Sequence, residues 1–297
     1  MKEITFSLLA LSAIAMSTSC QREEKTEQTE QQAMRFYASY DGDVTTKAST
    51  VFPTGNKATI IGYTAGAIVT SASPVTGTPI EATGGTSGSL SPASALYLPK
   101  GSYDFYSVSL NNTTPAGLTF TAGISGQLSN GVDYLWAKHA SVNEGGTVIF
   151  LYTHKAVGME INVSAGTGVS EMSITSIKFT PGKPDVSSKM SLSTGTIEAA
   201  VTKDESTSMN ITAGKGTFIM VPLASQALNA EVTINATIGG TPFTGKVYTA
   251  TIPAQAYTGG TYYTLNMTVS ATSMSFTGAQ VQDWTTQTIS GATLTEQ

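Results

Sequence analysis

Charged residues and cysteine are both scarce in this chain of 297 residues. Only 12% of the residues are charged and the net charge is -5, whereas soluble proteins usually contain about 25% charged residues. No basic stripe with interleaved aromatics is present, so we expect no binding to nucleic acid. Because Cys20 is the only cysteine, an intrachain disulfide is impossible.

The side chains that usually carry catalysis or bind metals are also sparse. Neither His139 nor His154 stands at a metal-ligand spacing from cysteine or carboxylate residues, and a zinc site needs three or four converging ligands. We expect His154, in an apolar stretch, to be a hydrogen-bonded structural residue and His139 to lie in a loop. The sequence has no Gly-x-Ser-x-Gly elbow and its acidic residues are scattered. We therefore expect no enzyme, no metal and no cofactor.

The N-terminus has the pattern of an export signal, "MKEITFSLLALSAIAMSTSC". Its apolar run, 4–16, is shorter than the roughly 20 residues that span a bilayer. Cys20 stands either by chance near an ordinary cleavage site or at the lipidation position of a lipoprotein signal, and "STSC" favours the second interpretation. We expect 1–19 to be the signal peptide and 20–33, which is charged and rich in glutamine, to be a flexible tether.

The remaining chain shows strand alternation between turn residues and almost no helical periodicity, which is typical of β-sandwiches. A hydrophobic content of 40% suffices for cores. We expect the segment 70–94 to be a long surface excursion, because it is rich in Ser, Thr, Gly and Pro. Strands are expected within 34–40, 57–65, 94–110 (two strands joined at Pro99-Lys100-Gly101), 146–166, 172–182, 216–224, 230–252 (a hairpin at Gly239-Gly240) and 260–284.

A polar, glycine-rich turn, "NEGGT" at 143–147, separates two apolar blocks. Two domains also match the length, at roughly 150 residues per domain, with one large β domain as the alternative. We therefore predict an N-terminal domain over 34–146 and a C-terminal domain over 147–297.

The first strand begins the alternating pattern. Its apolar face carries Met34, Phe36, Ala38 and Tyr40, and the polar loop after it contains one basic residue, Lys47.

Two surface functions suit a chain of this composition. A β-sheet with a vacant edge accepts a strand from a neighbouring molecule. Exposed aromatics bind glycans, although aromatic residues are more often core fillers. The glycan candidates are Tyr97, Tyr103, Phe105, Tyr106, Trp136, Tyr262, Tyr263 and Trp284.

Several motifs, taken in order, resemble the Bacteroidales fimbrillin family, whose members are lipoprotein-derived subunits of type V pili. After the lipoprotein signal and the first strand come "TKA", "NKATIIGYTA", "DYLWA", "VIFLYTHKAVGMEINV", "YTGGTYYTLNMTV" and "VQDW", at 46–48, 56–65, 133–137, 148–163, 257–269 and 281–284. The chain departs from the family pattern at Ser17 in the lipobox, at Thr153 before His154, and at Lys47, where an arginine-specific protease would need Arg.

This resemblance implies two tandem transthyretin-like β-sandwich domains and a pilus subunit on the cell surface, carried to the outer membrane by a lipid on Cys20. A protease would cut in the loop after the first strand, between Lys47 and Ala48, and the strand with Met34, Phe36, Ala38 and Tyr40 would leave. The vacated groove would take a donor strand from the next subunit.

The expected donor is the C-terminal end, 284–297, with Trp284, Ile289, Ala292 and Leu294 as its apolar residues. These four do not share one alternating face, so a bulge at Gly291 or a different donor stays open. Two further roles also stay open. One is a tip or accessory adhesin that binds a glycan or a host protein. The other is an anchor subunit that keeps its lipid.

Overall fold

The computed structural model describes residues 31–40, 51–204, 207–270, 274–283 and 294–296. These residues form strands and loops with a single short 3-10 turn, η1 (Thr86–Gly88). The prediction of an all-β chain is confirmed. Within the described ranges, no helix has the length and hydropathy needed to cross a membrane.

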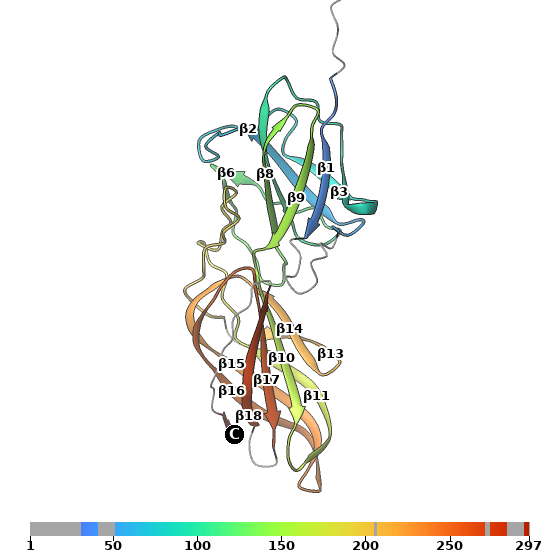
Figure 1. Cartoon of the computed structure of the whole chain (residues 1–297). Coiled ribbons are helices and arrows are strands. Elements are labelled where there is room, and N and C mark those ends of the chain that lie inside the picture. The colour runs from blue at the N-terminus through green and yellow to red at the C-terminus, as the bar shows by residue number, and fades with distance from the viewer. Residues whose placement is uncertain (1–30, 41–50, 205–206, 271–273, 284–293, 297) are drawn as a thin grey trace, which may run out of the picture. The chain divides into compact units, whose positions relative to one another are not determined.

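The N-terminal strands form a closed barrel (Figure 1). The first and last strands of the barrel are neighbours: the blue β1 lies beside the yellow-green β9 and pairs with it in parallel. In order around the barrel the strands are β1 (Arg35–Tyr40), β4 (Ser89–Pro92), β3 (Ile80–Gly84), β2 (Lys57–Thr64), β5 (Ser102–Ser109), β8 (Leu135–Asn143) and β9 (Thr147–His154). We predicted a β-sandwich for this part of the chain. The strands instead form a closed ring, because β1 pairs with both β4 and β9.

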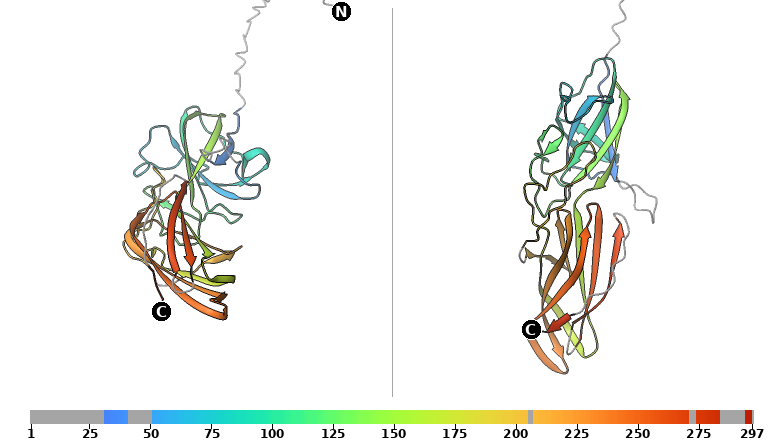
Figure 2. Two further views of the ribbon diagram at one scale, coloured as in Figure 1. Left: turned by 60° about the horizontal axis from the view of Figure 1, so that its bottom comes forward. Right: turned by 90° about the vertical axis from the view of Figure 1, so that its left-hand side faces the viewer.

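The later strands form two five-stranded sheets, which Figure 2 shows as two layers, one with the orange β15 and β16 and the other with the red β17. One sheet has the order β13 (Asn210–Thr212), β14 (Lys215–Met220), β10 (Val157–Ala165), β17 (Thr261–Val269) and β18 (Met274–Asp283). The other has the order β12 (Thr207–Ser208), β11 (Val169–Phe179), β15 (Leu223–Ile238), β16 (Thr241–Tyr257) and β19 (Leu294–Glu296).

The predicted hairpin of 230–252 is the pair β15 and β16, the longest strands of the molecule. Its turn is Gly239-Gly240, with φ of +56° and +83°. Two successive left-handed residues match the right-handed twist of the flanking strands, and glycine adopts that conformation without a steric cost. A small separate ribbon, β6 (Phe120–Thr121) with β7 (Ile124–Ser125), completes the strands.

Two expectations about the region before β5 are wrong. The segment 94–101 is not a strand, and only the second expected strand, β5, forms. The excursion 70–94 contains the strands β3 and β4, which pair with each other and complete the ring between β2 and β1. Both strands are short, four or five residues, so they carry too little alternation to be recognised among turn residues.

The predicted domain seam at 143–147 is also misplaced. These residues form the turn between β8 and β9, and both strands belong to the barrel. The chain passes from the barrel to the other sheets after β9, where Lys155 and Ala156 precede β10. The apolar stretch 146–166 is therefore two strands of two different sheets, and the break between them has no glycine or proline to mark it.

Candidate functional site

The place that β1 occupies in the barrel is the candidate site. All six residues of β1 are in parallel register with β9, from Arg35 opposite Thr147 to Tyr40 opposite Tyr152. On its other side the strand meets β4 at two residues only, Phe36 and Tyr37. The strand thus closes the ring through one long ladder and one short ladder.

The inward face of β1 fills the barrel interior, and it is the face that the alternation predicted. Met34, Phe36 and Ala38 are 2–4% exposed, and Tyr40, the fourth residue of the predicted face, is half-buried against the same core. The Phe36 ring meets Phe105 edge-on at 5.5 Å and stacks on Phe150 at 6.2 Å. Burial of this kind is the main stabilising contribution of a strand, at about 25 cal/mol per Å² of apolar area.

The other core residues of the barrel come from the remaining strands of the ring and from loop residues Phe52, Leu96 and Leu98. The cluster consists of Phe52, Ala58, Ile60, Ile80, Ala82, Leu90, Leu96, Leu98, Tyr103, Phe105, Leu135, Ala137, Val142, Val148, Phe150 and Tyr152. Removing β1 would therefore open a groove floored by large apolar side chains.

The entry of the strand is tied to the barrel before β1 begins. Met34 donates its backbone N–H to the Leu96 carbonyl at 2.9 Å, and the Gln31 side chain donates from Nε2 to the Leu98 carbonyl at 3.0 Å. Gln31 was assigned to the tether 20–33, so the last part of that tether already contacts the folded barrel.

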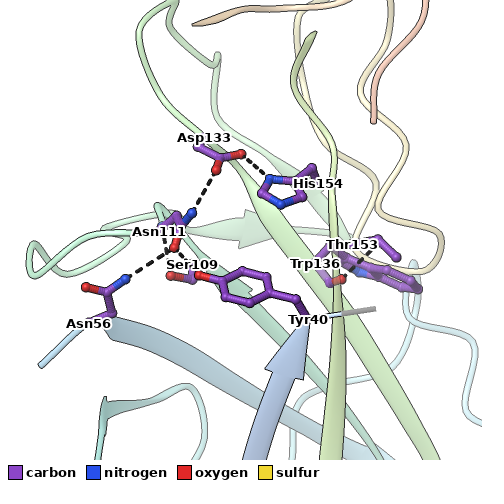
Figure 3. Close-up of polar contacts among 8 residues, drawn as sticks. All are labelled: Tyr40, Asn56, Ser109, Asn111, Asp133, Trp136, Thr153 and His154. Atoms are coloured by element: carbon purple, nitrogen blue, oxygen red, sulfur yellow. Dashed lines mark hydrogen bonds and ion pairs between the residues drawn. The ribbon is translucent and has the colours of Figure 1, made fainter. Parts of the chain in front are cut away.

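A polar cluster holds the end of the strand (Figure 3). The Tyr40 hydroxyl donates to Asn111 Oδ1, which also accepts from Asn56 Nδ2 at 3.2 Å. Asn111 Nδ2 donates to Asp133 Oδ2 at 2.8 Å, and the other carboxylate oxygen of Asp133 lies 2.7 Å from His154 Nδ1. This Tyr40 cluster therefore joins β1 to the end of β9 and to the loops after β5 and before β8.

The environment of the Tyr40 hydroxyl also changes its acidity. Burial and the negative charge of Asp133 raise the pKa of Tyr40 from 10.0 to about 12, against a smaller lowering by Asn111. The hydroxyl is therefore a hydrogen-bond donor at every pH at which the protein would work.

The predicted processing site lies outside the described residues. Neither Lys47 nor Ala48 belongs to them, because the structure is described up to Tyr40 and again from Val51. After the gap the chain lies beside β1: Phe52 donates its N–H to the Ala38 carbonyl at 3.1 Å, and Val51 bridges to Ser39. The described chain therefore resumes beside the last residues of β1.

The candidate donor strand is described only in part. Trp284, Ile289 and Ala292 lie outside the described residues. Leu294 begins β19, which pairs antiparallel with β16, with Leu294 opposite Ala250. In the single chain, the last described strand thus occupies an edge of its own sheet.

The histidines fulfil one expectation and contradict another. His154 is a structural residue that contacts Asp133, as predicted. His139 was expected in a loop but lies within β8, opposite Phe105, and its Nδ1 is 2.8 Å from the Ile149 carbonyl. The described part of the chain has no group of three or more His, Cys, Asp or Glu side chains that could hold a metal ion.

Four of the eight aromatic glycan candidates are core residues. The buried ones are Tyr103, Phe105, Tyr106 and Tyr263. This agrees with the expectation that aromatic residues on strands are more often core fillers than ligand contacts. Tyr262 is half-buried and touches Glu160, and Trp136 donates its indole N–H to the Leu192 carbonyl at 2.8 Å. Trp284 is outside the described residues, and Tyr97 is 54% exposed.

Sequence reasoning missed the partnership of Asn111 with Tyr40. A single asparagine after a strand is an ordinary loop residue, so no local signal marks it. The motifs "DYLWA" and "VIFLYTHKAVGMEINV" did contain Asp133 and His154, but nothing in their spacing shows that these side chains meet.

Known structures share this architecture. A structure from Bacteroides uniformis, described as that of a cell adhesion protein, matches with a TM-score of 0.62 at 15% identity, covering 87% of this chain and 99% of that one. One from Bacteroides ovatus matches with a TM-score of 0.61 at 15% identity, covering 86% and 99%. A fimbrial protein of Bacteroides vulgatus matches with a TM-score of 0.51 at 12% identity, covering 90% and 99%. At these identities the likeness shows the fold.

The family comes from the sequence comparison. A comparison with curated proteins finds no match. The profile described as fimbrillin-like matches residues 23–284, which is most of the chain. The chain therefore belongs to the fimbrillin-like family, the family of type V pilus subunits.

Proposed function

We propose that the chain is a structural pilin that polymerises by donor-strand exchange, and that β1 is the strand that is exchanged. The position of β1 carries this proposal: Met34, Phe36 and Ala38 fill the barrel interior, yet the ladder to β4 is only two residues long and is followed by single contacts with Val51 and Phe52. A strand bound in this way can be replaced by another extended segment without refolding the other strands.

The energetics favour exchange over simple loss of the strand. Without β1, the side chains of Phe105 and Phe150 lose their contacts with Phe36, and losing one buried Phe from a core costs about 3–5 kcal/mol. The unpaired backbone of β9 would add to that cost. An emptied barrel would therefore take up any matching strand, and the refilled subunit would dissociate slowly.

The export route belongs to the same proposal. A lipid on Cys20 would carry the precursor to the outer membrane and cell surface, with 1–19 removed as signal. Cleavage between Lys47 and Ala48 would then free β1 together with the lipid, because 41–50 follows β1 directly. Until that cut, β1 keeps the barrel closed and the precursor monomeric.

N-terminal sequencing of the surface form tests the cut. We expect a start at Ala48 and heat-sensitive ladders on gels run without boiling. The variant Lys47→Gln should remain monomeric, whereas the control Lys100→Gln, in an exposed loop, should polymerise normally. Polymers that retain residues 34–40 would refute the exchange of β1. A start at Cys20 would instead identify an anchor subunit.

A further inference from the structure

A groove lies on the surface of the barrel between the segment 73–77 and the segment 95–99, and its volume is about 830 Å³. Pockets for small ligands usually fall between about 300 and 1,000 Å³. Gln31, which precedes β1, is part of its lining, so the groove described here is that of the chain that retains β1.

One wall presents Tyr97 to the solvent. Its neighbours Leu96 and Leu98 are 3% and 1% exposed, whereas Tyr97 is 54% exposed. Successive side chains of an extended segment point to opposite sides, so the two buried leucines fix Tyr97 outward. The carbonyls of the same leucines accept the hydrogen bonds from Met34 and Gln31, which hold this wall in place.

The opposite wall is held equally firmly. Val75 donates its N–H to the Gly62 carbonyl at 2.8 Å, and the Thr78 hydroxyl donates to the Val75 carbonyl at 2.9 Å. The two walls touch at Gly77, where an added Cβ would come within 2.8 Å of a Leu96 methyl carbon. The groove is thus formed before any ligand arrives, which reduces the entropic cost of binding.

The lining combines one exposed aromatic face with uncharged polar groups. Its exposed polar residues are Gln31, Thr64, Ser73 and Thr76, and none of its lining residues carries a charge. Hydroxyl and amide side chains both donate and accept hydrogen bonds. A charged ligand would find no counter-ion here, and a proline-rich peptide would need a series of aromatic ridges rather than one exposed ring.

We propose that this groove binds a neutral oligosaccharide, with one pyranose ring stacked on Tyr97. A pyranose ring has a face of C–H groups, which matches the aromatic ring, and a rim of hydroxyls, which matches the neutral donors and acceptors on both walls. Tyr97 supplies the contact area, and Gln31, Ser73 and Thr76 supply the hydrogen bonds that orient the sugar.

Titration of the ¹⁵N-labelled chain, observed by NMR, tests this site. The probes are maltotetraose, cellotetraose, xylotetraose and N-acetyllactosamine, with sialyllactose as the acidic arm and a proline-rich decapeptide as the peptide arm. We expect at least one neutral sugar to bind and to shift amides within 73–77 and 95–99. Tyr97→Ala should weaken that binding at least tenfold, whereas Tyr97→Phe should retain it.

Tyr37→Ala is the matched control, because Tyr37 is an exposed tyrosine on the outer face of the barrel, and it should leave the affinity unchanged. Thermal unfolding confirms that each variant is folded. The proposal is overturned if no neutral sugar binds at millimolar concentration, if Tyr97→Ala binds as tightly as the unaltered chain, or if only sialyllactose or the peptide binds.

Discussion

The ring of Tyr40 stacks on the imidazole of His154, with centroids 5.7 Å apart and ring planes at 5° to each other. The two residues are the last of β1 and the last of β9. These strands pair in parallel with Tyr40 opposite Tyr152, so β9 extends two residues past β1, and its last residue stacks on the last residue of the closing strand. Any strand that replaces β1 would meet the same imidazole and the same Asn111 acceptor.

Phe36→Ala tests how much of the barrel depends on the inward face of β1. Truncating a buried Phe leaves a cavity, so we expect the free energy of unfolding to fall by about 3–5 kcal/mol. Tyr37→Ala changes the adjacent, 41% exposed residue and should cost about 0.5 kcal/mol. Urea denaturation measures both, and equal losses would show that burial on β1 does not stabilise the barrel.

Asp133→Ala tests the Tyr40 cluster. The change leaves the Asn111 amide and the His154 ring without the carboxylate that contacts both, and we expect a loss of about 1–3 kcal/mol. Hydrogen exchange should quicken at the amides of Ser39 and Tyr40. Glu81→Ala, which removes a partly exposed ion pair with Lys57, is the control and should cost at most about 1 kcal/mol. Unchanged exchange in Asp133→Ala would show that the cluster does not hold β1.

Alkaline titration tests the environment of the Tyr40 hydroxyl. The folded protein keeps the phenol neutral up to a pKa of about 12, whereas the unfolded chain releases the proton near 10.0. The contribution of Tyr40 to stability is therefore fully present below pH 10 and is lost as the pH rises from 10 to 12. Thermal melts of Tyr40→Phe should show a smaller decline between pH 9.5 and 11.5 than melts of the unaltered chain. Parallel declines would contradict the raised pKa.

Gly88→Ala tests the contact between the turn η1 and β1. Gly88 has φ of +73°, and an added Cβ would lie 2.5 Å from the Ala38 carbonyl oxygen. Gly131 has φ of +79° with no atom within 4 Å of its added Cβ, so Gly131→Ala carries the backbone strain alone, about 1 kcal/mol. We expect Gly88→Ala to destabilise the protein clearly more than Gly131→Ala, as measured by urea denaturation. Equal effects would show that β1 shifts freely away from η1.

Much of this architecture could be predicted from local patterns. The inward face of β1 follows from alternation over Met34, Phe36 and Ala38, because a strand has a side-chain period of two wherever it lies. The hairpin at Gly239-Gly240 follows from the conformational freedom of two glycines. The strands β3 and β4 were missed because each is too short to show a period, and they are strands only through pairing with neighbours.

By itself, the sequence determined the all-β class, the family pattern and the face that β1 buries, since each depends on residues close together in the chain. Only the tertiary structure decided that β9 completes the barrel beside β1, that Asp133 contacts His154, and that Tyr97 stands exposed beside a groove. These features join residues far apart in the sequence. Their physical cause is long-range pairing and packing, which closes the ring only when β1 satisfies the backbone of β9 and fills the apolar interior.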